Sequence, residues 1–207
     1  NATNGALDAI GPDNGRDKID NYTNANYDSV TVLNSFLGDM SANPMQYSFI
    51  HFSEPDQVGH ASSWGSTEYM NAVKTVDGYL GQIFNLINTD PQLTGKTAVI
   101  LTADHGGTGT GHGDPTLPLD YTIPFMAWGP GVSAGAELYN MNGTTRANPG
   151  TSRPLYSANP QPIRNSDGAN LALGLLGLGA IPDSTMNASQ NLVLSYSQAS
   201  YAGGTYS

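Results

Sequence analysis

The sequence predicts a three-layer α/β/α protein with a mostly parallel β-sheet, and three features of its pattern support this fold class. Apolar residues recur at helical spacing in residues 28–40 and again in residues 67–87. Two short apolar runs, residues 47–52 and 97–102, have the length and composition of buried strands. Helices and strands therefore alternate along the chain, an order typical of a parallel sheet covered by helices.

The two helical segments carry the clearest periodicity in the chain. Asn43-Pro44 ends the first one, and Ser66 is suited to cap the second, with Glu68 near the positive end of the helix dipole. The apolar stripe of the first helix is formed by Val30, Leu33, Phe36, Leu37 and Met40. The stripe of the second is formed by Met70, Val73, Val76, Leu80, Ile83, Phe84 and Ile87.

The remaining elements are shorter. Residues 97–102 are the clearest strand, and residues 123–128 are a further strand candidate that ends at Gly129-Pro130-Gly131. Residues 132–166 are rich in loops, and Asp167 caps a last short helix. Residues 1–27 are polar and rich in turn-forming residues.

Composition limits the function classes. The 207 residues suit one domain, and a net charge of −10 with seven Lys and Arg argues against binding the nucleic-acid backbone. The absence of cysteine excludes disulfides and thiolate metal sites. No apolar run approaches the length of a membrane span, so none is predicted. An acidic chain rich in Asn, Ser, Thr and Gly favours a secreted or periplasmic location.

Residues with metal-binding chemistry follow the two best strands. Asp56 and His60 come after residues 47–52, and Asp104 and His105 come directly after residues 97–102. Ligands of open α/β sheets bind beyond the carboxyl ends of the strands, so this is where a site is expected. Three of the four histidines of the chain fall in these segments, the third being His112.

The spacing of these residues lets them meet at one site. Asp56 and His60 point the same way if their segment is helical. The glycines of residues 106–111 allow a tight return of the chain that brings His112 back. Each pair alone is more typical of a surface turn, but the two pairs together indicate a site for a divalent metal such as zinc.

The same residues carry a family resemblance. Residues 49–60, 101–107, 123–132 and 162–167 resemble the alkaline phosphatase superfamily, most closely its type I phosphodiesterase/nucleotide pyrophosphatase branch. The resemblance extends over residues 28–180 and implies an alkaline-phosphatase-like domain. One departure is the segment Ala61-Ser62-Ser63-Trp64, which delays the glycine expected after His60 to Gly65. Within it, Trp64 is expected either to have a packing role or to shape the substrate pocket.

The resemblance implies two divalent ions, for which we expect zinc, and a small phosphate-ester substrate. Asp56 and His60 would bind one ion with His112 as third ligand, and Asp104 and His105 would bind the other. The function implied is a two-metal phosphoester hydrolase, a phosphodiesterase or phosphatase.

Members of this family also carry an upstream segment with another aspartate ligand and a Thr or Ser nucleophile. Residues 1–46 contain no such unit, so we expect the chain to be the C-terminal part of the domain, with the nucleophile outside it. An N-terminal fragment of the same precursor is then an expected partner. Two alternatives stay open: a non-catalytic secreted structural or surface-assembly protein, and a sulfatase or phosphonate hydrolase on the same scaffold.

Overall fold

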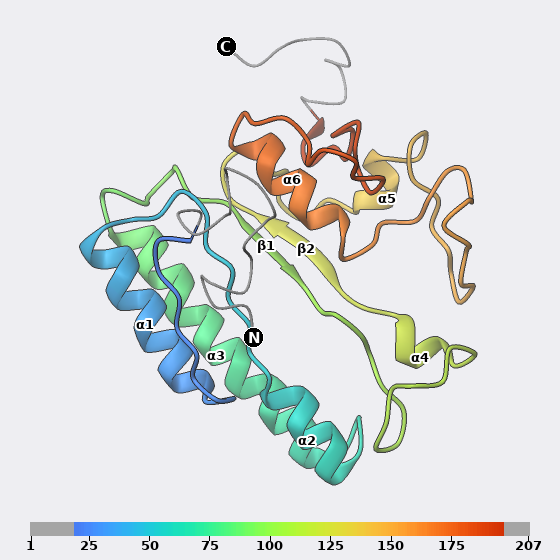
Figure 1. Cartoon of the computed structure of the whole chain (residues 1–207), viewed down its shortest axis with the longest axis horizontal. Coiled ribbons are helices and arrows are strands. Elements are labelled where there is room, and N and C mark those ends of the chain that lie inside the picture. Colours follow the sequence, from blue (N-terminus) through green and yellow to red (C-terminus); the bar gives the residue numbers. More distant parts are fainter. Residues whose placement is uncertain (1–18, 197–207) are drawn as a thin grey trace, which may run out of the picture.

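The computed structural model describes residues 19–196, so most of the turn-rich segment 1–27 lies outside the described residues. The helices are α1 (Ser29–Ala42), α2 (Glu54–Ser62), α3 (Thr67–Thr89), α4 (Pro118–Tyr121), α5 (Leu138–Met141) and α6 (Asp167–Leu175). The strands are β1 (Val99–Thr102) and β2 (Phe125–Trp128). Figure 1 shows α1 and α3 side by side on one side of the strands, and α5 and α6 on the other.

Side-chain caps begin both α1 and α3, and the cap of α3 is the predicted Ser66. The Asp28 carboxylate accepts the N–H groups of Val30 and Thr31 at the start of α1. The Ser66 hydroxyl accepts the N–H of Tyr69 at 3.1 Å at the start of α3. Each cap satisfies backbone donors that have no partner within the helix. The two predicted helices are therefore confirmed to within two residues of their predicted ends.

The sheet of the described residues differs from the predicted one. β1 and β2 pair antiparallel, with Val99 opposite Trp128 and Thr102 opposite Phe125, and they form a two-stranded sheet. A parallel pairing needs a crossover, usually a helix, that carries the chain back to the same end of the sheet. Between β1 and β2 the chain forms only the four-residue helix α4, and it folds straight back.

Helices cover both faces of this small sheet. Val99 packs against a core cluster of Leu33, Ile83 and Ile87 from α1 and α3. Its neighbour Ile100 packs against a second cluster, whose buried members are Leu171, Leu192 and Leu194. Successive residues of a strand point to opposite faces, so β1 packs against the fold on both sides and its residues are half-buried, as in an α/β fold.

Residues 47–52, predicted as a buried strand, run without regular secondary structure. Ile50 and Phe52 pack against the α1–α3 core, whereas the Phe49 side chain is 80% exposed. A strand requires a neighbouring strand to pair its backbone N–H and C=O groups. This segment has no such neighbour among residues 19–196, and the strand prediction is wrong for this part of the structure.

A buried ion pair organises the C-terminal part of the fold. The Nη2 atom of Arg146 lies 3.1 Å from Oδ1 of Asp167, which is the first residue of α6 and not its predicted cap, because Ser166 holds the N-cap position. The same Nη2 also donates to the side chain of Asn187, and the other Asp167 oxygen accepts the N–H of Arg164 at 2.7 Å. Both charged side chains are more than nine-tenths buried, so the network fixes α6 against the chain that follows it.

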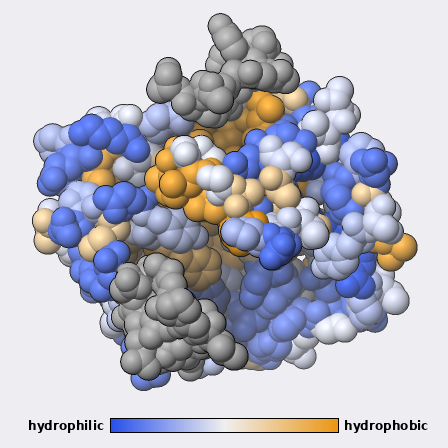
Figure 2. All heavy atoms as spheres, turned by 45° about the horizontal axis from the view of Figure 1, so that its top comes forward, coloured by the Kyte–Doolittle hydropathy of each residue, from blue (hydrophilic) through white to orange (hydrophobic). Residues whose placement is uncertain are grey.

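The surface carries both polar and apolar areas. Figure 2 shows a face that is hydrophilic around its margins, with hydrophobic residues gathered toward its centre and top. Within residues 19–196, no helix is both long enough and apolar enough to cross a membrane.

Candidate metal centre

Helix α2 presents two of the predicted ligands on one face. The helix begins at Glu54, and Pro55 is accepted in its first turn because the N–H groups there have no partner within the helix. Asp56 and His60 are four residues apart, and Nε2 of His60 lies 3.4 Å from Oδ1 of Asp56. The helical turn on which the sequence prediction depended is therefore present.

The segment after β1 presents the other three. Asp104 and His105 follow the last residue of β1, and the chain then turns through a bridge between Thr108 and Gly111. Gly109 has a φ of 60°, in the left-handed region that favours glycine, so this position suits the tight turn. Residues of α4 accept the N–H groups of Gly106 and Gly107 at 2.9 and 2.8 Å, which holds the loop in place. The turn brings His112 back toward α2.

Three imidazole nitrogens converge on one carboxylate oxygen. Oδ1 of Asp56 lies 3.4 Å from Nε2 of His60, and 3.7 Å from Nε2 of both His105 and His112. The ligand atoms of Asp56, His105 and His112 all lie within 4.8 Å of one another. This Asp56 oxygen is buried and accepts no hydrogen bond among the described residues. An uncompensated buried carboxylate oxygen is costly, and a cation bound by these nitrogens would compensate it.

Backbone carbonyls fix the tautomers of two of these histidines. Nδ1 of His60 lies 2.9 Å from the carbonyl oxygen of Thr110, and Nδ1 of His105 lies 2.8 Å from that of Gly106. A carbonyl can only accept, so both Nδ1 atoms carry a proton, and in the neutral imidazole the Nε2 atoms that face Asp56 are then the ones free to bind a metal. Metal-binding histidines are held in this way by a hydrogen bond from the second ring nitrogen. The donor set therefore fits a divalent metal.

Asp104 lies at the margin of this cluster. Its Oδ2 is 3.6 Å from Nε2 of His105, which is also 3.7 Å from Asp56. The Asp104 side chain is 73% exposed, compared with 42% for Asp56. All five predicted residues are thus brought together, with His105 between the two carboxylates.

The structure also adds residues that the sequence analysis missed. The Tyr79 hydroxyl donates to Glu54 at 3.1 Å and joins α3 to the start of α2, and burial together with this bond raises the pKa of Tyr79. The Asn165 amide donates to the carbonyl oxygen of Asp104 at 3.2 Å. Neither contact can be predicted from the spacing of neighbouring residues in the sequence, because each joins segments that are far apart along the chain.

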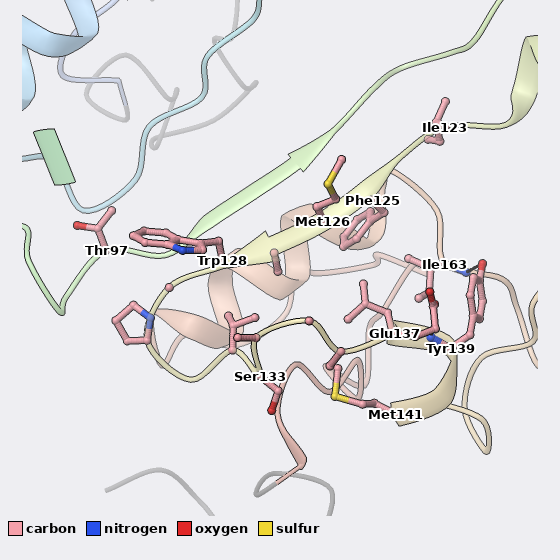
Figure 3. Close-up of a pocket in the computed structure, with 18 of the residues that line it drawn as sticks. Thr97, Ile123, Phe125, Met126, Trp128, Ser133, Glu137, Tyr139, Met141 and Ile163 are labelled. Atoms are coloured by element: carbon pink, nitrogen blue, oxygen red, sulfur yellow. Dashed lines mark hydrogen bonds between the residues drawn. The ribbon is translucent and has the colours of Figure 1, made fainter. Parts of the chain in front are cut away.

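A separate large cavity lies along β2. It has a volume of about 930 Å³ and is lined by Phe125, Trp128, Glu137, Tyr139 and Ile163, among others. Figure 3 shows side chains of β2 and of the loop before α5 around it. None of the five predicted metal ligands lines this cavity, so it is separate from the predicted metal site.

Comparison with known proteins identifies the family. The family described as type I phosphodiesterase / nucleotide pyrophosphatase matches residues 8–168. Among curated proteins, a GPI ethanolamine phosphate transferase 1 of Aspergillus oryzae is 35% identical over 134 residues, which cover 63% of this chain and 13% of that protein. Those of Mus musculus and Homo sapiens are 36% and 33% identical over 84 residues, which cover 41% of this chain and 9% of each relative.

The matched region is therefore a small part of each relative, between 9% and 13% of the length of these three. No solved structure matches the chain. The family match extends over most of the chain and includes all five predicted ligands. The chain belongs to the type I phosphodiesterase/nucleotide pyrophosphatase family, within the alkaline phosphatase superfamily.

Proposed function

We propose that this chain is the metal-binding part of a two-metal phosphoester hydrolase, a phosphodiesterase or phosphatase, whose nucleophile lies outside these 207 residues. The observation that supports this best is the convergence of three Nε2 atoms on the buried Oδ1 of Asp56. Membership of a phosphoester-processing family supports the reaction class.

Asp56, His60 and His112 would hold one ion, and Asp104 and His105 would hold the second, with zinc as the proposed metal. Such ions supply Lewis acidity at a phosphoryl group and stabilise the attacking and leaving oxygens. The five ligands suit this role because neutral imidazoles and carboxylates are the donors that zinc accepts without thiolates. Nδ1 of His60 and Nδ1 of His105 each donate a hydrogen bond to a backbone carbonyl oxygen. Both Nε2 atoms are therefore available to bind a metal ion.

Charge and exposure suit an anionic substrate. The chain has a net charge of −10, which would repel a phosphate ester. The ligand set contributes two negative charges, from Asp56 and Asp104, and two divalent ions would make the site positive locally. The side chains of His60 and Asp104 are 47% and 73% exposed, so a substrate can reach this side of the centre from solvent.

We also propose that the complete domain has a mostly parallel sheet. Support for an α/β layered domain comes from β1, whose Val99 packs against the α1–α3 core cluster on one face and whose Ile100 packs against the cluster of Leu171, Leu192 and Leu194 on the other. A secreted or periplasmic location is part of the same proposal, and its support is the acidic, cysteine-free composition.

A second candidate is transfer of ethanolamine phosphate to an alcohol. It is favoured by the relatives, which are named as GPI ethanolamine phosphate transferases. Hydrolysis and transfer would share the metal centre and differ in whether water or an alcohol accepts the phosphoryl group. Incubation with a phosphoethanolamine diester and an acceptor alcohol distinguishes the two reactions. Transfer yields a new diester, whereas hydrolysis yields free phosphoethanolamine.

To test the proposal, we would measure the intact mass and the metal content of the protein from its natural source, and then assay it for phosphoester cleavage. We expect about two divalent ions per chain, a larger parent chain or a co-purifying fragment, and cleavage of a nitrophenyl phosphodiester or monoester that chelation abolishes. A sole 207-residue species without metal and without cleavage would contradict the proposal.

A further inference from the structure

The indole of Trp64 lies among the imidazoles of the metal centre. Its ring centroid is 5.1 Å from that of His60, with the rings nearly perpendicular at 86°. It is 5.7 Å from the ring of His112 and 6.4 Å from that of His105. The Tyr69 ring of α3 lies 6.1 Å from the indole. One side chain thus contacts ligands that come from two separate segments of the chain.

Glycines on both segments make room for this indole. A Cβ atom added at Gly59, in α2, would lie 2.7 Å from the indole, and one added at Gly107, in the loop after β1, would lie 2.2 Å from it. Both distances are far below van der Waals contact, so only glycine allows either backbone to approach so closely. The indole therefore fills the space between α2 and the loop that carries His105 and His112.

The backbone around Trp64 strengthens this connection. The Trp64 N–H donates to the carbonyl oxygen of Gly109 at 2.8 Å, which joins the end of α2 to the tip of the loop. Ser63, directly before it, has a φ of 83°, in a region that non-glycine residues rarely adopt. This strained residue lies where the chain leaves α2, and its conformation directs Trp64 toward the loop.

From these contacts we propose that Trp64 is a positioning residue of the metal centre. By setting the separation between α2 and the loop of residues 103–113, it holds the Nε2 atoms of His105 and His112 against Oδ1 of Asp56. It binds no metal itself, because the indole N–H is a donor only. The proposal rests on the proposed metal-binding function and assigns a residue that the ligand set alone does not include.

The test uses zinc titration of the 207-residue chain and its variants. We expect Trp64→Ala to weaken zinc affinity by about 10- to 100-fold, the range found when groups that orient metal ligands are removed. Trp64→Phe should restore most of the affinity, because a second aromatic ring fills much of the same space. Trp128→Phe is the matched control, since Trp128 packs on Phe84 with a centroid separation of 4.9 Å and lies outside the histidine cluster.

Glycine variants test the same idea without removing the indole. Gly107→Ala should displace the ring and weaken zinc binding, whereas Gly113→Ala, in the same loop, should not, because nothing lies within 4 Å of its added Cβ. Circular dichroism and urea unfolding identify any variant that fails to fold. If Trp64→Ala fails to fold, the zinc affinities of Trp64→Phe and Gly107→Ala are compared with that of the wild type instead. Wild-type zinc affinity in folded Trp64→Ala and Gly107→Ala would overturn the proposal while leaving the metal site intact.

A metal-free measurement separates this proposal from the proposed function. The rings of His105 and His112 are stacked with centroids 3.7 Å apart, so nuclear Overhauser effects between their ring protons report the geometry without metal. We expect these effects in the wild-type chain and in Trp128→Phe, and their loss in Trp64→Ala. If the wild type binds no metal, the proposed function fails, and these effects alone decide the positioning role: their persistence in Trp64→Ala would overturn it.

Discussion

Nε2 of His60 and Nε2 of His112 lie 3.2 Å apart, the first on α2 and the second beyond the glycine-rich turn. Nδ1 of His60 donates to the carbonyl oxygen of Thr110, so in the neutral imidazole Nε2 is the nitrogen that is free to bind a metal. Both nitrogens lie beside Oδ1 of Asp56, so a cation bound at this oxygen would lie close to both. This geometry predicts the effects of replacing His112 and Asp56, and contacts elsewhere in the fold predict two effects on stability.

Replacing His112 tests whether it is a ligand, which is the assignment that family motifs support least. We expect His112→Ala to lower zinc affinity by a factor on the order of 100 or more, because it removes a ligand rather than a group that supports one. His51→Ala is the control, since His51 is exposed and lies outside the cluster. Equal zinc affinities for the two variants in a competition titration would show that His112 is not a ligand.

The buried ion pair predicts a stability effect that is independent of metal. Arg146→Ala leaves the Asp167 carboxylate buried without its charged partner, and we expect a loss of about 3–5 kcal/mol in the free energy of unfolding. Arg153→Ala, at an exposed position over the Tyr121 ring, should cost less than about 1 kcal/mol. Urea unfolding in the presence of a chelator measures both, and similar losses in the two variants would refute the role of the pair.

The cap of α1 predicts a pH dependence. The hydrogen bonds from Thr31 to the Asp28 carboxylate lower the pKa of this group below its usual value. A lowered folded-state pKa contributes stability above the unfolded pKa, and this contribution is lost as the pH falls through the folded pKa. Wild type should therefore be more stable than Asp28→Asn at pH 7, and the difference should shrink in acid. A stability difference that does not change between neutral and acidic urea titrations would contradict this.

The elements that the sequence predicted well are those determined by local pattern. The stripe of Leu33 and Met40, the cap at Ser66 and the four-residue spacing of Asp56 and His60 depend on neighbours within a few turns. The return of His112 was also predictable, because the glycines before it permit a tight turn and Gly109 adopts a positive φ there.

The errors concern contacts between distant segments. Residues 47–52 have the composition of a strand, but a strand forms only where a partner pairs its backbone, and no local pattern specifies that partner. The antiparallel direction of β2 depends on how the chain passes through α4, which the alternation of elements did not reveal. The position of Trp64 between Gly59 and Gly107 likewise needed the three-dimensional structure.

The most direct test of the metal centre is the zinc stoichiometry and affinity of the wild-type chain compared with Asp56→Asn. Oδ1 of Asp56 is the atom on which the histidine nitrogens converge, so this substitution removes the charge at the centre with little change in shape. Asp77→Asn, on the exposed face of α3, is the matched control. We predict about two bound ions for the wild type and the control, and a loss of at least one from Asp56→Asn. No bound zinc in the wild type, or unchanged binding in Asp56→Asn, would contradict the metal centre described here.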